Sequence, residues 1–329
     1  MNTKTILMES RLTMRKFILD IDTGIDDALA LTYLLSRRKE AEVLGVTATY
    51  GNTTLEGAYE NTIRMLGALK RLDVRVYKGA NHPLLSEYDP EPLKKIVHGE
   101  NGIGNVELPE VVVEEETISA WDFMIESGKK YGSELTIIAV GPMTDLAKAF
   151  EKDKDVFKDV KFVLMGGALG VPGNASQFAE ANFHEDPPAA KIVLESGLDI
   201  TMVGLDVTMQ TLITGSDISK WEQYDNIAAK ALYDMSEYYY TFESNNAANP
   251  SGCLHDPLAV EVAINPDIIS QYLCTDLTCE TEGPSKGRSI GKVDKIHGGE
   301  DTTKVALQVK EQEFKDKFVN SISELLKTL

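Results

Sequence analysis

Short apolar runs alternate with amphipathic segments along the first part of the chain. The runs at 16–21, 41–50 and 135–140 each end at polar or glycine residues, which is typical of buried strands. Between them, residues 26–36 and 54–69 carry apolar side chains three and four positions apart, which predicts helices. Strands that alternate with helices in this way form a parallel sheet with right-handed crossovers. The pattern therefore predicts a single Rossmann-like α/β domain with a mostly parallel sheet and helices on both faces.

The same alternation continues as far as residue 203. We expect three more strands and three more helices there, at 74–77, 160–165 and 199–203 and at 118–131, 144–152 and 187–196. Thr144 is the expected N-cap of its helix, because a threonine side chain can accept a hydrogen bond from a free N–H of the first turn. Residues 81–109 are rich in Pro and Gly, and we expect a long loop there.

The last third of the chain is less regular. Residues 218–242 show mostly helical spacing, and residues 310–326 predict a closing helix. Two short apolar runs, 289–293 and 305–309, are expected to pair as a terminal hairpin. Since no linker, repeat or low-complexity stretch divides the chain, we expect a tail at 1–14 followed by one domain at 15–329.

Composition narrows the partners that this chain can bind. Its 329 residues include 33 Lys and Arg against 52 Asp and Glu, a net charge of −19. That excess of acid argues against binding nucleic acid or an anionic membrane surface. No apolar run reaches the roughly 18–20 residues that span a bilayer, and the N-terminus has no apolar core of a signal peptide. The odd count of three cysteines is typical of a reducing compartment, and we expect a cytoplasmic protein.

One acidic cluster follows the first predicted strand directly. The segment DIDTGIDD places Asp20, Asp22, Asp26 and Asp27 within eight residues. In an open α/β sheet, ligands bind beyond the carboxyl ends of the strands, where this segment lies. Crowded carboxylates repel one another, and a hard divalent cation with oxygen ligands would relieve that repulsion. The simpler alternative is a surface turn followed by an acid-rich helix N-terminus.

Three metal-dependent interpretations of the cluster compete. An EF-hand loop is excluded, because counting from Asp20 places Gly24 fifth and Leu31 twelfth, whereas the loop needs Gly sixth and Glu twelfth. The segment FILDIDTG is similar to the first motif of haloacid-dehalogenase-type Mg²⁺ phosphatases, with Asp20 as nucleophile and Asp22 as acid/base. The later acidic strand end that this family uses for magnesium is not found. The third interpretation is a hydrolase whose acids hold Ca²⁺ and activate water.

Six segments in order extend the pattern over the chain from residue 15. They are DIDTGIDD, YGNTTLE, HGENGIGN, AVGPMTDLA, MGGALGVPGNASQFAEANFHEDPPAA and LHDPLAV. With them the sequence resembles the nucleoside hydrolase family, the inosine–uridine-preferring nucleoside ribohydrolases; Thr23 stands where Pro is commoner. The resemblance implies Ca²⁺-dependent hydrolysis of the N-glycosidic bond of small-molecule ribonucleosides in nucleoside salvage. It also implies a homo-oligomer, dimer or tetramer. An inactive calcium- or ribose-binding module remains an alternative.

The resemblance also assigns roles to individual residues. Asp22, Asp27, Asp256 and the carbonyl of Val140 would bind Ca²⁺, and Asp22 would also be the general base toward water. His255 would be catalytic, protonating or contacting the leaving base. The residues expected to bind substrate are Asp26, Asn52, His98, Met165, Asn174, Glu180 and Asn182. Asp20 would brace the loop. For the run Tyr238–Tyr240, core packing and stacking on the base both remain open.

Overall fold

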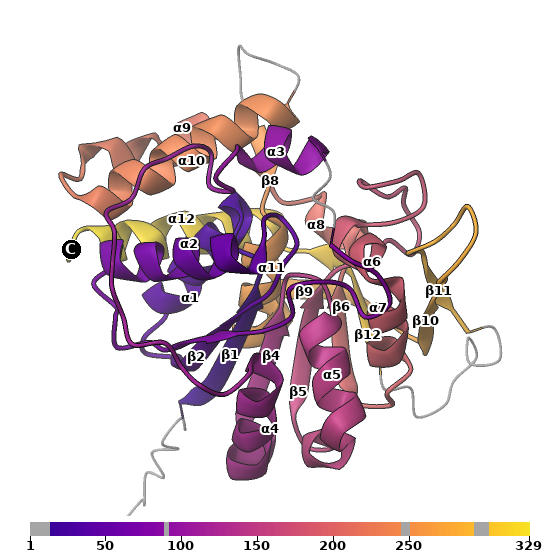
Figure 1. The fold of residues 1–329 in the computed structure, drawn as a ribbon. Coiled ribbons are helices and arrows are strands. Elements are labelled where there is room, and N and C mark those ends of the chain that lie inside the picture. The colour runs from indigo at the N-terminus through magenta and orange to yellow at the C-terminus, as the bar shows by residue number, and fades with distance from the viewer. Residues whose placement is uncertain (1–13, 89–91, 245–250, 293–302) are drawn as a thin grey trace, which may run out of the picture.

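Eight strands form the central sheet. The computed structural model describes residues 14–88, 92–244, 251–292 and 303–329; the predicted tail at 1–14 therefore lies outside it except for Met14. The strands are β1 (Arg15–Ile21), β2 (Ala41–Ala48), β3 (Val76–Lys78), β4 (Leu135–Ala139), β5 (Lys161–Met165), β6 (Asp199–Val203), β9 (Ile269–Cys274) and β12 (Thr303–Val309). Their order is β3-β2-β1-β4-β5-β6-β12-β9 (Figure 1). All neighbours pair in parallel except β12 and β9, so the predicted mostly parallel sheet is confirmed.

Helices connect the strands, and the described residues also form two small two-stranded sheets. The helices are α1 (Ile25–Ser36), α2 (Leu55–Ala68), α3 (Pro92–His98), α4 (Ala120–Tyr131), α5 (Thr144–Asp153), α6 (Ala181–Glu185), α7 (Pro187–Leu194), α8 (Leu205–Thr208), α9 (Gly215–Ile218), α10 (Ile227–Glu243), α11 (His255–Ile264) and α12 (Glu311–Leu326). The small sheets pair β7 (Leu212–Thr214) with β8 (Ser251–Cys253) and β10 (Leu277–Cys279) with β11 (Ser289–Gly291). Among these helices none has the length and apolar character to cross a bilayer.

Two hydrophobic cores lie on opposite faces of the sheet. Successive residues of a strand point to opposite faces, and β1 follows this rule: Phe17, Leu19 and Ile21 belong to one core, while Ile18 belongs to the other. The first core contains side chains of α1, α2, α10, α11 and α12, and the second contains side chains of α4, α5 and α7. Both faces are therefore covered (Figure 1), which explains why the strands read as continuous apolar runs.

The order in which strands are added to the sheet reverses between β1 and β4. From β1 the chain builds outward through β2 and β3 on one side, and from β4 through β5 and β6 on the other. Such a switch point leaves a crevice beyond the carboxyl ends of the two strands, where α/β proteins bind ligands. The chain after β1 and the chain after β4 stay together there, since the Val140 N–H donates to the Asp20 carbonyl at 2.9 Å. The fold thus places the acidic segment beside this crevice.

Three local predictions are wrong. Residues 81–109 are not loop throughout, because they contain α3. Thr144 is not an N-cap: Met143 holds that position, and the Thr144 hydroxyl donates to Asp186 Oδ2 at 2.8 Å. The terminal hairpin does not form, since β11 pairs with β10 while β12 lies between β6 and β9. Val293, the last residue of the first predicted hairpin strand, is outside the described ranges.

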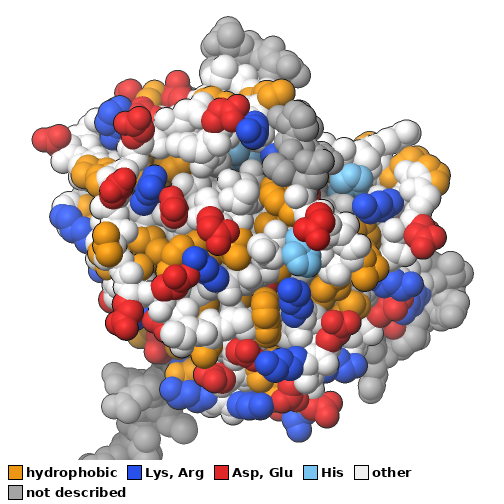
Figure 2. Space-filling view, in the orientation of Figure 1, with side chains coloured by type: hydrophobic (Ala, Val, Ile, Leu, Met, Phe, Trp, Pro, Cys, Tyr) orange, Lys and Arg blue, Asp and Glu red, His pale blue; other side chains and the backbone are white. Residues whose placement is uncertain are grey.

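Charged side chains of both signs are dispersed over one face of the molecule. On the face shown in Figure 2, basic side chains are interspersed with acidic ones, and no continuous basic patch covers its described residues. A nucleic-acid-binding face would instead concentrate Lys and Arg along one groove. The excess of acid is thus mostly solvated and dispersed on this face.

Candidate active site

A cavity of about 290 Å³ lies at the crevice. It is lined by nearly all of the residues that the sequence predicted for the site. The predicted residues in its lining are Asp26, Asn52, His98, Val140, Met165, Asn174, Glu180, Asn182, His255 and Asp256. Asp22 and Asp27 do not line the cavity, yet they bond to Asn52, which does. Residues from all six motif segments therefore meet at one place.

Hydrogen bonds fix the acidic loop between β1 and α1. The backbone N–H of Asn52 donates to Asp22 Oδ2 at 2.6 Å, and the Asn52 side-chain amide donates to Asp27 Oδ2 at 3.0 Å. Asp27 also accepts from the N–H of Gly24 at 2.8 Å and from that of Asp22 at 3.2 Å. Asp22 Oδ1 is different, because it is buried and accepts no hydrogen bond from the described residues. One carboxylate oxygen of the loop thus remains available to a ligand.

Three carboxylates form a geometric cation site. Oxygens of Asp26, Asp27 and Asp256 lie within 4.8 Å of one another, and all three residues are buried. Asp26 and Asp27 belong to the first turn of α1, and Asp256 belongs to the first turn of α11. The predicted metal ligands included Asp22 and assigned Asp26 to the ribose, whereas this closest group contains Asp26 and omits Asp22. The two sets share Asp27 and Asp256.

The charged forms of these buried carboxylates are disfavoured by their surroundings. Burial is the main cause that raises the pKa of Asp22, Asp27 and Asp256, and the charges of neighbouring aspartates raise the pKa of Asp22 and Asp256 further. A divalent cation bound among them would reverse both effects, because it replaces lost hydration and offsets the repulsion. The donor set of carboxylate and carbonyl oxygens is the kind that Ca²⁺ prefers. The residues present therefore fit a hard cation.

Asp20 is separate from this group. It is fully buried, its Oδ1 accepts a hydrogen bond from the Thr47 hydroxyl at 2.6 Å, and it does not line the cavity. A phosphatase of the haloacid-dehalogenase type would need this carboxylate as an accessible nucleophile. The placement of Asp20 argues against that alternative.

The segment at 174–182 forms the opposite wall. Glu180 is the N-cap of α6: its carboxylate accepts from the N–H groups of Asn182 at 2.8 Å, Gly167 at 2.9 Å and Phe183 at 3.2 Å. The Asn182 amide donates to the carbonyls of Val140 at 2.7 Å and Met165 at 3.1 Å. These bonds join the ends of β4 and β5 to α6. They orient the polar groups that the sequence assigned to ribose binding.

His98 reaches the cavity from α3. Its Nδ1 accepts a hydrogen bond from the N–H of Ile25 at 3.2 Å, which places the proton of the neutral ring on Nε2. Burial is the main cause that lowers the pKa of His98 to about 3. The ring approaches so closely that a Cβ on Gly24 would lie 2.6 Å from Nδ1, which accounts for glycine at that position. His98 is thus a neutral donor, not an acid, at physiological pH.

His255 lies at the start of α11 beside the cation site. Its Nδ1 is 2.8 Å from the Thr208 hydroxyl, and the residue is 5% exposed. That contact orients the ring while the side chain lines the cavity. His255 and His98 therefore reach the cavity from different helices, α11 and α3.

Other lining residues were left open or missed by sequence reasoning. Tyr239 and Phe242 of α10 line the cavity, and the Tyr239 ring stacks on His98 with centroids 5.8 Å apart. Tyr239 and Tyr240 both belong to the buried core, and Tyr239 also lines the cavity, so core packing is confirmed for both while stacking on the base stays a prediction for Tyr239. Lys94 and Val97 come from α3, which the sequence assigned to a loop. The run PLKKIVH has apolar residues four apart, a weak helical signal that could have pointed to them.

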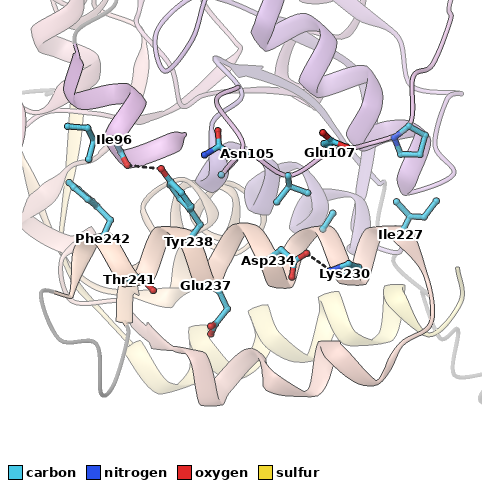
Figure 3. A pocket seen from close by; sticks show the side chains of 14 residues that line it. Ile96, Asn105, Glu107, Ile227, Lys230, Asp234, Glu237, Tyr238, Thr241 and Phe242 are labelled. Carbon is cyan, nitrogen blue, oxygen red and sulfur yellow. Dashed lines mark hydrogen bonds and ion pairs between the residues drawn. The ribbon is translucent and has the colours of Figure 1, made fainter. Parts of the chain in front are cut away.

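A second, larger cavity lies on the outer side of α10. It has a volume of about 1040 Å³ and runs between α10, Ile96 of α3 and residues 104–109 (Figure 3). Two contacts cross or follow it: the Tyr238 hydroxyl donates to the Ile96 carbonyl at 3.1 Å, and Lys230 pairs with Asp234 at 2.6 Å. None of the buried aspartates of the cation site lines it. The predicted site residues therefore lie at the smaller cavity.

Known proteins resemble this chain in sequence and fold. A family model described as inosine-uridine preferring nucleoside hydrolase matches residues 17–316. Uridine nucleosidase 1 of Arabidopsis thaliana is 33% identical over 84% of this chain and 81% of that protein, and the pyrimidine-specific ribonucleoside hydrolase of Klebsiella pneumoniae is 32% identical over 91% and 95%. The solved structure of a purine-preferring ribonucleoside hydrolase from Gardnerella vaginalis superposes with a TM-score of 0.92 at 40% identity. It covers 96% of this chain and 100% of that one.

Proposed function

This chain belongs to the inosine-uridine preferring nucleoside hydrolase family, a family of N-glycosyl hydrolases, and we propose that it uses Ca²⁺ to split free ribonucleosides into ribose and base. The observation that carries the proposal is the convergence of Asp26, Asp27 and Asp256 within 4.8 Å beside a cavity of about 290 Å³. Nucleoside hydrolysis needs a site that binds a polar sugar and activates water. A buried group of carboxylates at a sheet switch point suits that chemistry.

Four residues would hold the cation. We assign Asp22, Asp27, Asp256 and the carbonyl of Val140 to it, and the geometry supports Asp26 as a close neighbour. The Val140 carbonyl accepts one hydrogen bond from Asn182 and has a second lone pair for the ion. When bound, the cation would orient ribose hydroxyls and make a nearby water more acidic.

Asp22 is the proposed general base. Its Oδ2 is held by the N–H of Asn52, whereas its Oδ1 is buried and accepts no hydrogen bond from the described residues. A water in the cavity could donate to this oxygen and lose its proton as it attacks the sugar. The Asn52 hydrogen bond keeps the Asp22 carboxylate in one orientation, so less entropy is lost when the reactive geometry forms.

The opposite wall would bind the ribose. Glycosidic cleavage passes through an oxocarbenium-like state, so groups that favour positive charge on the sugar accelerate it. Asp26 would accept from the 2′-hydroxyl, while Asn174, Glu180 and Asn182 would orient the ring over Met165. The Glu180 carboxylate already accepts three backbone N–H groups, so it is held rigidly for this task.

Two histidines would contact the base. His255 would contact or protonate the departing base, and its ring is oriented by Thr208. His98 would donate from Nε2–H to an acceptor of the base, because its Nδ1 is occupied by Ile25. Tyr239 would extend the aromatic wall beside His98.

A panel of nucleosides tests the proposal. Inosine, guanosine, adenosine, uridine and cytidine are incubated with the protein in CaCl₂ or in EGTA, and released ribose is measured by a reducing-sugar assay. We expect ribose release that EGTA abolishes, and Asp22→Ala to lower kcat by about 10³-fold or more without a change in the circular-dichroism spectrum. Near wild-type turnover by folded Asp22→Ala would refute the general base. No turnover of any nucleoside by wild-type protein would favour the inactive binding module.

The physiological setting forms part of the same proposal. We infer a role in cytoplasmic nucleoside salvage, supported by the family and by the odd count of three cysteines. The family resemblance further supports a homodimer or homotetramer. Cell fractionation checks the location, and light scattering on the purified protein checks the mass.

A further inference from the structure

Lys94 is the one lysine or arginine among the described residues that line the catalytic cavity. It lies on α3, and its side chain is 15% exposed. We propose that Lys94 is a positioning residue of the hydrolytic site, whose ammonium group ties α3 to Gly51 and to Glu185 and thereby sets the positions of His98 and Asn52. The inference rests on the proposed function, since it names what holds that site together.

The ammonium group has a built set of partners. Lys94 Nζ donates to the Gly51 carbonyl at 2.7 Å and forms an ion pair with Glu185, whose side chain is 11% exposed. The Tyr88 ring faces the same ammonium with its centroid 5.4 Å away, and the Tyr88 hydroxyl donates to the Gly51 carbonyl at 2.6 Å. Removing one partner of a shielded ion pair of this kind costs far more stability than removing one partner of an exposed pair.

The Gly51 contact leads to the catalytic carboxylates. Gly51 directly precedes Asn52, whose N–H donates to Asp22 Oδ2 and whose side-chain amide donates to Asp27 Oδ2. Gly51 itself has φ +155°, and a Cβ there would lie 2.0 Å from Asp22 Oδ2, so this turn is packed against the general base. A shift of the Gly51 peptide would therefore move both hydrogen bonds of Asn52.

The position of His98 depends on the same contact. Lys94 and His98 are four residues apart on α3, which brings them to the same side of the helix. With seven residues, α3 is too short to be stable by itself, so tertiary contacts must position it. Besides Lys94, these include the Tyr238 bond to the Ile96 carbonyl (Figure 3), the Ile25 bond to His98 and the stack of His98 on Tyr239. Lys94 is the charged contact among them.

Glu185 links the ion pair to the ribose wall. It is the last residue of α6, and Asn182 of the same helix donates to the carbonyls of Val140 and Met165. The Lys94–Glu185 pair thus connects the wall that carries His98 to the wall that carries Asn182. Loss of the pair should displace substrate groups on both sides of the cavity.

The experiment compares Lys94→Met, Glu185→Gln, the double variant and Lys94→Arg by steady-state kinetics in saturating calcium. Lys95→Met is the matched control, because Lys95 is the next residue and forms an exposed pair with Glu100 at 3.0 Å. We expect Lys94→Met and Glu185→Gln each to lower kcat/KM about 10-fold or more, with the double variant no worse than the poorer single. Lys94→Arg should recover most of the loss. Lys95→Met should match wild type.

A second measurement does not depend on activity. Hydrogen–deuterium exchange over residues 92–98 should be faster in Lys94→Met and Glu185→Gln than in wild type and Lys95→Met, with Tm changed by no more than a few degrees. Wild-type kcat/KM in Lys94→Met, additive losses in the double variant, or unchanged exchange would each overturn the positioning role. If wild-type protein hydrolysed no nucleoside, the proposed function would fail while exchange still decided whether Lys94 holds α3.

Discussion

Replacing Asp256 by Asn should have opposite effects on stability with and without calcium. Unit charges 4.8 Å apart, the outer limit for Asp26, Asp27 and Asp256, repel by about 3.5 kcal/mol per pair at an effective dielectric constant of 20. The raised pKa values of Asp27 and Asp256 let protonation relieve part of that repulsion. We therefore expect metal-free Asp256→Asn to be about 2 kcal/mol more stable than metal-free wild type.

Calcium reverses the order. A ligand at about 1,000 times its Kd stabilises the folded protein by about 4 kcal/mol, and the variant should lose most of this gain. A chain of 329 residues unfolds with an entropy of about 0.7 kcal/mol per kelvin at about 2.1 cal/mol/K per residue. The variant should thus melt roughly 3 °C above wild type in EGTA and roughly 3 °C below it in calcium.

Differential scanning fluorimetry at pH 7.5 in EGTA and in a calcium series measures both differences. Asp145→Asn is the matched control, because Asp145 is also fully buried but lies outside the cation site, with its Oδ1 accepting from the N–H of Ala80 at 2.7 Å. Its effect on Tm should be the same in EGTA and in calcium. An Asp256→Asn protein that melts below wild type in both conditions would refute the reasoning, as would a wild-type Tm that calcium leaves unchanged.

Three further perturbations test other parts of the structure. His98→Gln should make the free energy of unfolding less dependent on pH below about 6.5. In wild type the lowered His98 pKa of about 3 costs about 2 kcal/mol of stability at pH 5, and thermal melts at pH 5 and 7 would detect the difference between the two proteins. Asp145→Asn should gain stability over wild type as pH rises from 5 to about 7 and keep a constant margin above that, since burial raises the Asp145 pKa to about 7 while the unfolded carboxyl ionises at lower pH; melts across pH 5 to 8 would show the gap widen and then level off. Glu261→Gln should lower stability by about 3 kcal/mol in a urea titration, because the buried Glu261 carboxylate accepts from Tyr33 at 2.7 Å and Arg37 at 2.6 Å.

The parts of the fold that could be predicted are those whose pattern is local. β1 and α1 follow directly from apolar runs and helical spacing, and the acidic segment between them needed no tertiary information. The short motifs then predicted which residues line the cavity, because strand ends meet at a sheet switch point. The base-contacting wall on α10 was left open, since Tyr239 and Tyr240 are neighbours in the sequence and differ only in direction.

The parts that failed depend on distant partners. α3 has only seven residues, and its position depends on Lys94 and His98, whose partners are far away in the sequence. β12 has a strand sequence, but its neighbours β6 and β9 are chosen by packing and not by proximity along the chain. The local sequence predicts Thr144 as an N-cap, but its hydroxyl donates a hydrogen bond to Asp186, 42 residues later.

Two helix N-termini point their first turns at the cation site. Asp26 and Asp27 occupy the first turn of α1, and Asp256 occupies that of α11. The partial positive charge of a helix N-terminus favours an adjacent carboxylate by about 0.3–1 kcal/mol, up to about 2 when partly buried. Burial of each ion costs several kcal/mol, so the two dipoles offset only part of it. The fold therefore holds these carboxylates together at a net cost that a bound cation would remove, and the raised pKa values of Asp27 and Asp256 reflect that cost.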